Sequence, residues 1–126
     1  MLAEYPPIAF LATVDAARSR RFYETALGLT FVSEDQFAIV FELRESQLRL
    51  QKVRELTPAQ HTVFGWAVPS LEIATKELQR RGVAFERYSF LAQDENGIWT
   101  APSGARIAWL KDPDGNVLSL TEARRY

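Results

Sequence analysis

Apolar and polar positions along the first half of the chain follow the period of a strand, then of a helix, then of strands again. An apolar run at 8–14 is followed by Asp15, a residue type that begins helices. Apolar side chains recur at helical spacing over 16–27, and Gly28 is suited to end that helix. Three strand-like runs follow: LTFVSE, FAIVFEL and QLRLQKV. The pattern predicts a β-α-β-β-β module.

The second half repeats this order. TVFGWAV reads as a strand, Ser70 as the start of a helix and Gly82 as its end. Three further strand-like runs follow: VAFERY, RIAWL and NVLSL. GLTF at 28–31 and GVAF at 82–85 occupy equivalent places in the two halves. The repeat predicts an α+β fold of two tandem modules.

The segment RELTPAQH, with Pro58 near its centre, is the expected linker between the modules. We therefore expect a single domain over 1–126, with module one at about 6–54, the linker at about 55–61 and module two at about 62–122. The last residues, EARRY, are expected to form a surface tail.

Composition narrows the classes of function. The chain has 126 residues, 47% of them hydrophobic and 25% charged, as in a globular domain with a hydrophobic core. A net charge of -1 gives no field to attract nucleic acid or an anionic membrane, and no apolar run is long enough to span one. The absence of cysteine excludes disulfides and thiolate catalysis, and no signal-peptide pattern is present. We expect a cytoplasmic protein with neither a nucleic-acid nor a membrane partner.

Two segments carry a family resemblance. The repeated module order, with VDAARSRRFYETALGLTFV in the first half and WLKDPDGNVLSL in the second, resembles the glyoxalase, bleomycin-resistance and extradiol-dioxygenase (vicinal oxygen chelate) superfamily. The resemblance covers nearly the whole chain. It implies curved mixed sheets with helices on their convex sides, a cup enclosed by the sheets, and a homodimer.

The resemblance also implies four metal-ligand positions, one on each of four strands facing the cup. In this chain they carry Ile8, Arg49 (or Gln51, if the register slips by two), Trp66 and Ser119. Ile8 and Trp66 provide no donor atom, and the Arg49 cation repels a metal ion. Gln51 and Ser119 are only weak neutral donors. We therefore expect neither a metal nor any other cofactor.

What remains is a cup with a mostly apolar and aromatic lining, which is typical of a small-molecule pocket. Strand alternation predicts that these side chains face into it: Ile8, Phe10, Arg49, Gln51, Phe64, Trp66, Val68, Val117, Ser119 and Thr121. The expected ligand-binding residues are Phe10, Arg49, Gln51, Trp66 and Ser119. Two alternatives remain open: Trp66 fills the core, and Arg49 forms an ion pair with Glu42.

The segment SFLAQDENGIWTAPSG at 89–104 is longer than a connection needs to be. It is either a lid that carries Phe90 and Trp99, or a strand at GIWTAP ending in a PSG turn, with Trp99 packed on the sheet or at a dimer contact. The pattern slightly favours the strand.

Three functions fit these observations, and the first is preferred. It is a metal-free protein that binds a small organic molecule. The second is an enzyme: a divergent metal-dependent lyase or dioxygenase, or a metal-free catalyst that uses Arg49, Gln51, Tyr88 and Ser119. The third is an association module with a filled cup. No Ser-His-Asp set is present, because the only histidine, His61, lies in or beside the linker.

Overall fold

The structure, a computed structural model, describes residues 1–122, so all but the first residue of the tail EARRY lies outside the described residues. The chain divides into two compact units, 1–58 and 59–126. The boundary falls after Pro58, inside the segment predicted to be the linker. Whether the two modules form one domain stays a prediction.

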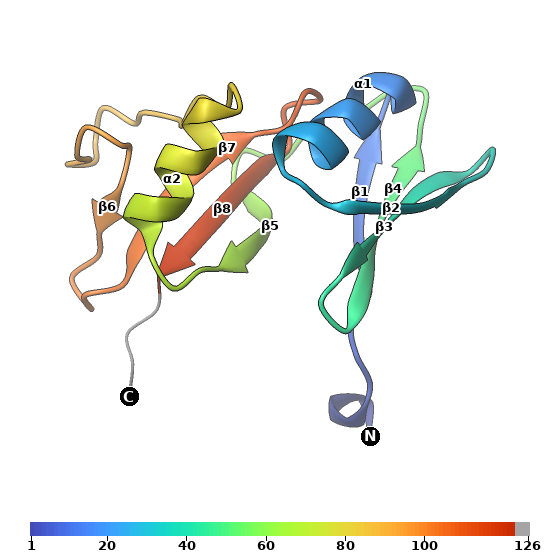
Figure 1. Cartoon of the computed structure of the whole chain (residues 1–126), viewed down its shortest axis with the longest axis horizontal. Helices are drawn as coiled ribbons and strands as arrows, with labels where there is room; N and C mark the ends of the chain where they lie inside the picture. The colour runs from blue at the N-terminus through green and yellow to red at the C-terminus, as the bar shows by residue number, and fades with distance from the viewer. Residues whose placement is uncertain (123–126) are drawn as a thin grey trace. The chain divides into compact units, whose positions relative to one another are not determined.

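The first unit is a four-stranded mixed sheet with a helix. It contains η1 (Leu2–Glu4), β1 (Ala9–Thr13), α1 (Ala16–Arg21), a π-helical turn η2 (Phe22–Ala26), β2 (Thr30–Glu34), β3 (Ala38–Leu43) and β4 (Ser46–Lys52) (Figure 1). The strand order is β1-β4-β3-β2, and β1 runs parallel to β4. The predicted helix over 16–27 is thus an α-helix that widens into a π turn at Phe22.

Side-chain hydrogen bonds fix where α1 begins. The Asp15 carboxylate accepts a hydrogen bond from the Arg18 backbone N–H at 3.1 Å, as its predicted capping role requires. The Thr13 and Ser19 hydroxyls, both buried, are 2.7 Å apart and join the end of β1 to the helix. Tyr23 then packs on Phe41, with ring centroids 5.8 Å apart, and closes the core between helix and sheet.

The second unit repeats this arrangement. It contains β5 (Thr62–Ala67), α2 (Leu71–Arg80), β6 (Trp99–Thr100), β7 (Arg106–Lys111) and β8 (Val117–Glu122). The strand order β5-β8-β7-β6 matches that of the first sheet, and β5 runs parallel to β8. The predicted α+β fold with two mixed sheets and two helices is confirmed.

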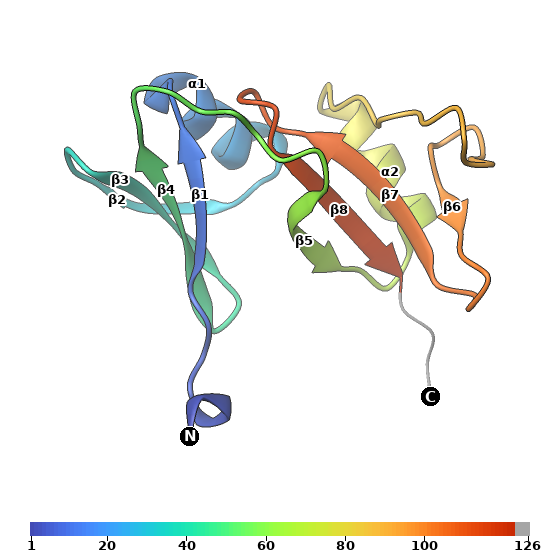
Figure 2. The ribbon, with the colours of Figure 1, turned by 180° about the vertical axis from the view of Figure 1, so that it is seen from behind.

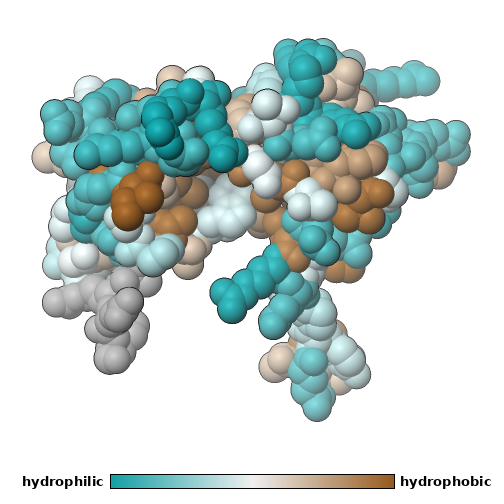
Figure 3. All heavy atoms as spheres, viewed as in Figure 1, coloured by the Kyte–Doolittle hydropathy of each residue, from teal (hydrophilic) through white to brown (hydrophobic). Residues whose placement is uncertain are grey.

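Helix α2 covers one face of the second sheet. Figure 1 shows α2 in front of β7 and β8, and Figure 2 shows the opposite face of the same sheet. Ser70 accepts a hydrogen bond from the Ile73 N–H and begins the helix. Arg106 on β7 donates to Glu72 on α2 at 2.5 Å and to Glu122 on β8 at 2.7 Å. The outer side of α2 is mostly hydrophilic, beside one small hydrophobic patch (Figure 3).

The DPDGN turn sets the register of β7 and β8. One oxygen of the Asp112 carboxylate accepts from the Asp114 N–H at 3.0 Å and from the Asn116 N–H at 2.9 Å. Its other oxygen accepts from the Asn116 side-chain amide at 2.8 Å. The segment therefore works as a turn, and it places Trp109 opposite Ser119.

One predicted strand is wrong. VAFERY forms only an isolated bridge from Phe85 to Leu110 and a hydrogen bond from the Glu86 N–H to the Trp109 carbonyl. The chain then leaves the edge of β7 and returns as β6, where Trp99 pairs with Ile107. Residues 87–98 form a loop between the residues that pair with β7 at 85–86 and those that pair with it at 99–100. The strand prediction for 89–104 is therefore confirmed only for Trp99–Thr100, which is followed by a turn at 102–104.

No helix within residues 1–122 combines the length and apolarity that crossing a bilayer requires.

The close pairing of β5 with β8 generates a stability prediction. A Cβ added to Gly65 would collide with the carbonyl oxygen of Ser119 and lie 2.8 Å from its Oγ. Gly65→Ala is expected to lower the free energy of unfolding by about 1–3 kcal/mol, as overpacking typically does. Urea denaturation of the variant and the parent protein measures the difference.

The double variant Gly65→Ala, Ser119→Ala is the control. It removes the hydroxyl but leaves the backbone carbonyl in place, so it should recover little of the lost stability. Wild-type stability of Gly65→Ala would contradict the close approach of the two strands at this point.

Candidate functional site

The second sheet has one face that α2 does not cover. Side chains opposite one another in register share a face, so the row Gly65, Ser119 and Trp109 lies together. Leu118 and Leu120 alternate with this row and point to the face of α2, where both are buried. We call the face of Ser119 and Trp109 the open face of the second sheet.

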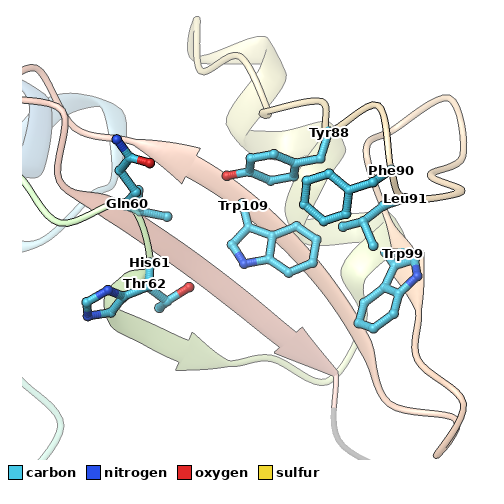
Figure 4. A pocket seen from close by; sticks show the side chains of 9 residues that line it. Gln60, His61, Thr62, Tyr88, Phe90, Leu91, Trp99 and Trp109 are labelled. Carbon is cyan, nitrogen blue, oxygen red and sulfur yellow. The ribbon is translucent and has the colours of Figure 1, made fainter.

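A pocket of about 300 Å³ lies on this open face, at the lower end of the range for small-molecule sites (Figure 4). Five parts of the second unit contribute to it: the residues at the start of β5, the looped-out segment 87–98, β6, β7 and β8. Its lining residues are Gln60, His61, Thr62, Tyr88, Phe90, Leu91, Trp99, Trp109 and Val117.

Four aromatic rings form the main wall of the pocket. Tyr88 stands at 86° to Trp109, with centroids 5.5 Å apart, and Trp99 lies at 33° to Trp109 at 6.0 Å. Phe90 packs on Tyr88 at 5.7 Å and is 80% exposed. These separations and angles are those at which aromatic pairs attract each other. The wall is therefore a self-supporting cluster with one side open to solvent.

The polar groups of the pocket are mostly neutral. None of the nine lining residues is Asp, Glu, Lys or Arg. Burial raises the pKa of the Tyr88 hydroxyl, and the nearby Glu86 carboxylate raises this pKa further. The phenol thus stays protonated at neutral pH and can donate a hydrogen bond. Its oxygen points toward the side of the pocket where Gln60 lies (Figure 4).

Ser119 lies on the face predicted for it. It is between Gly65 and Trp109 in register, and only 9% of its surface is exposed. It is not among the residues that line the pocket. The small hydroxyl fits a place where the neighbouring strand comes too close to tolerate even a methyl group at Gly65.

The predicted placement of Trp66 beside Ser119 is wrong. Trp66 pairs with Leu120, so it points to the α2 side, where its ring meets Phe64 at 4.7 Å. Trp66 thus packs on the side of the core, as the alternative expects, but it is only half-buried there. The internal repeat indicates the correct face of Trp66. Trp66 lies four residues before Ser70, and the buried Leu11 lies four residues before Asp15.

The remaining predicted residues, Phe10, Arg49 and Gln51, belong to the first unit. Phe10 pairs with Arg49, and Gln51 follows two residues later, so all three share the face opposite the buried Leu50. Arg49 donates to Gln47 Oε1 at 3.2 Å. Among residues 1–122, no ion pair joins it to Glu42. Their role in ligand binding stays a prediction.

The side chains at the four metal-ligand positions implied by the resemblance do not fit a divalent cation. Ile8 has no donor, Arg49 is a cation and Ser119 is a weak neutral oxygen donor. The ligand position on the fifth strand was assigned to Trp66. The internal repeat instead places it at Val63, which lies seven residues before Ser70 as Ile8 lies seven before Asp15. Val63 has no donor atom either. Within residues 1–122, no three His, Cys, Asp or Glu side chains are grouped to hold a metal ion.

Sequence reasoning missed most of the pocket. The sequence offers Phe90 and Trp99 as part of a possible lid, Tyr88 as a possible catalytic residue and Val117 as a residue that faces the cup, and all four line the pocket. It does not predict that Trp109 belongs to a site. Alternation does provide a signal for Trp109, because it lies between the buried Ala108 and Leu110 and must point to the other face. No periodicity identifies Tyr88 or Leu91.

Comparison with known proteins agrees with the architecture. The family model described as the glyoxalase/bleomycin resistance protein/dioxygenase superfamily matches residues 6–120. The chain therefore belongs to this superfamily. No curated protein matches the chain.

Several solved structures share the fold. A superfamily member from Sphaerobacter thermophilus is 22% identical, with 94% of this chain and 97% of that one covered and a TM-score of 0.72. A lactoylglutathione lyase from Agrobacterium tumefaciens is 16% identical, with 94% and 96% covered and a TM-score of 0.71. A glyoxalase/bleomycin resistance protein/dioxygenase from Alicyclobacillus acidocaldarius is 20% identical, with 94% and 91% covered and a TM-score of 0.69. At these identities the similarity defines the fold alone.

Proposed function

We propose that this member of the superfamily binds a flat, uncharged and largely apolar organic molecule in the aromatic pocket of the second unit, without a metal held by the protein. The observation that carries the proposal is the wall of Tyr88, Phe90, Trp99 and Trp109 on a sheet face that α2 does not cover. Partly exposed aromatic rings of this kind offer stacking surface to a planar ligand.

The polar groups support an uncharged ligand. A buried ionic group needs a partner of opposite charge, and the pocket lining contains no Asp, Glu, Lys or Arg. The Tyr88 hydroxyl, the Gln60 amide and the Thr62 hydroxyl can instead hydrogen-bond a neutral oxygen or nitrogen at the edge of the ligand. These few polar groups would orient a ligand that the aromatic wall attracts.

The metal-free part of the proposal follows from the donors. The positions at which metal-dependent relatives of this fold are expected to supply ligands carry apolar, cationic or weakly donating side chains here. A Lewis-acid reaction therefore has no support in these residues. The homodimer implied by the resemblance stays a prediction.

Binding of N-phenylnaphthylamine, a flat neutral dye, tests the pocket. Titration should give a saturable increase in dye fluorescence with a single site per chain. Trp109→Ala should weaken binding about tenfold or more, because it removes the ring that contacts both Tyr88 and Trp99. Phe37→Ala is the control, since Phe37 is 68% exposed but lies in the first unit.

Anilinonaphthalene sulfonate tests the charge of the ligand, because it adds an anionic group to the same aromatic skeleton. We expect it to bind about tenfold more weakly than the neutral dye. Equal loss of binding in the Trp109 and Phe37 variants, or tighter binding of the sulfonate, would contradict the proposal.

Metal content tests the other half of the proposal. After incubation with Mn, Fe, Co, Ni and Zn salts and removal of excess, elemental mass spectrometry should find less than about a tenth of an equivalent of each. Near one equivalent of any metal would overturn the metal-free proposal and favour a metal-dependent lyase or dioxygenase, with ligands to be sought at His61, Glu42 and Glu122.

A further inference from the structure

Gln93 makes three side-chain hydrogen bonds in and beside the looped-out segment of the second unit. The carboxamide of Gln93 accepts a hydrogen bond from the Tyr88 backbone N–H at 2.7 Å. Its amide nitrogen donates to the Glu86 carbonyl at 2.9 Å and to the Gly97 carbonyl at 2.8 Å. One side chain thus joins the start, the middle and the end of the segment.

A second set of contacts closes the far end of the loop. The Asp94 carboxylate accepts from the backbone N–H groups of Asn96 and Ile98, each at 2.9 Å. The Arg87 guanidinium donates to the carbonyls of Asp94 at 2.5 Å and Glu95 at 2.7 Å. The side chain of Ile98 is buried and anchors the chain just before β6 begins.

This network replaces the regular pairing that the segment lacks. Residues 87–98 contain no helix or strand, and backbone groups outside such elements need other partners. Fixing an irregular segment costs conformational entropy, which side-chain bonds must offset. The segment carries three of the nine residues that line the pocket, Tyr88, Phe90 and Leu91. The ordering of this segment therefore determines where these three lining side chains lie.

We infer that Gln93 is a positioning residue: it touches no ligand, but it fixes the backbone of Tyr88 and so places the Tyr88 ring against Trp109 before a ligand binds. This inference rests on the proposed function, because it assigns the residue a role in that same pocket. If the loop is already ordered, binding does not have to offset the loss of its conformational entropy. Affinity for the ligand therefore depends on the carboxamide of Gln93, which orders the loop. Gln93 is not itself a lining residue.

Gln93→Ala tests the inference, with Gln79→Ala as the matched control on the exposed side of α2. Gln93→Ala should weaken N-phenylnaphthylamine binding about tenfold, because the wall must then be ordered on binding. Gln79→Ala should bind as the parent does. Both variants should keep a single cooperative urea transition, since Leu110, Leu118 and the rest of the core are untouched. The midpoint should fall only in Gln93→Ala, because that variant loses three hydrogen bonds.

Amide hydrogen exchange gives a readout that does not need a ligand. The Tyr88 N–H should exchange at least about tenfold faster in Gln93→Ala, because its acceptor is removed. The N–H groups of Asn96 and Ile98, held by Asp94, should change less. Parent-like dye affinity, or parent-like exchange of Tyr88, in Gln93→Ala would overturn the inference.

The two readouts separate failure of the inference from failure of the proposed function. If the parent protein does not bind the dye, the neutral-ligand proposal fails, and Tyr88 exchange alone decides whether Gln93 fixes the wall. If the parent binds the dye and Gln93→Ala binds it equally well, the proposed function stands and the positioning role is overturned.

Discussion

The parallel pairing of β5 with β8 is the constraint on which the second unit depends. Gly65 lies opposite Ser119 with no room for a Cβ, so a register shift that placed a neighbouring residue there would drive its Cβ into the Ser119 carbonyl. A slip by one residue would exchange the two faces of a strand. This register sends Trp66 and Leu120 toward α2 and leaves Ser119, with Trp109 on the next strand, on the open face. The contact between Gly65 and Ser119 thus determines both which side chains face the core and which face the candidate site.

The site is built where that face meets an insertion. The open face of the sheet supplies Trp109 and Val117, but a flat sheet face alone is not a pocket. The chain leaves the edge of β7 after Glu86, makes the loop held by Gln93, and returns at Trp99. The loop thereby places the side chains of Tyr88, Phe90 and Leu91 beside the open face, where they line the pocket. In this chain the pocket thus depends on a segment outside the strands and helices, as functional sites commonly do.

The sequence predicted the parts of the structure that have a period. The repeated module order, the helix starts at Asp15 and Ser70 and the turn at DPDGN all follow from local chemistry. The predicted face of Trp66 was wrong because the prediction did not use the internal repeat, in which Trp66 is equivalent to the buried Leu11. The pocket could not be predicted, because it joins residues from five separate parts of the chain. Side-chain hydrogen bonds of Gln93, Asp94 and Arg87 hold the loop, and no periodicity indicates them.

The three tryptophans allow the central claim to be tested in one measurement. Trp99 and Trp109 belong to the pocket, whereas Trp66 lies on the other face of the same sheet. The indole N–H signals in a nitrogen-proton correlation spectrum, assigned with single Trp→Phe variants, can be followed while N-phenylnaphthylamine is added. We predict saturable shifts of the Trp99 and Trp109 signals and a stationary Trp66 signal. Shifts of Trp66 alone, or equal shifts of all three signals, would contradict binding at the open face.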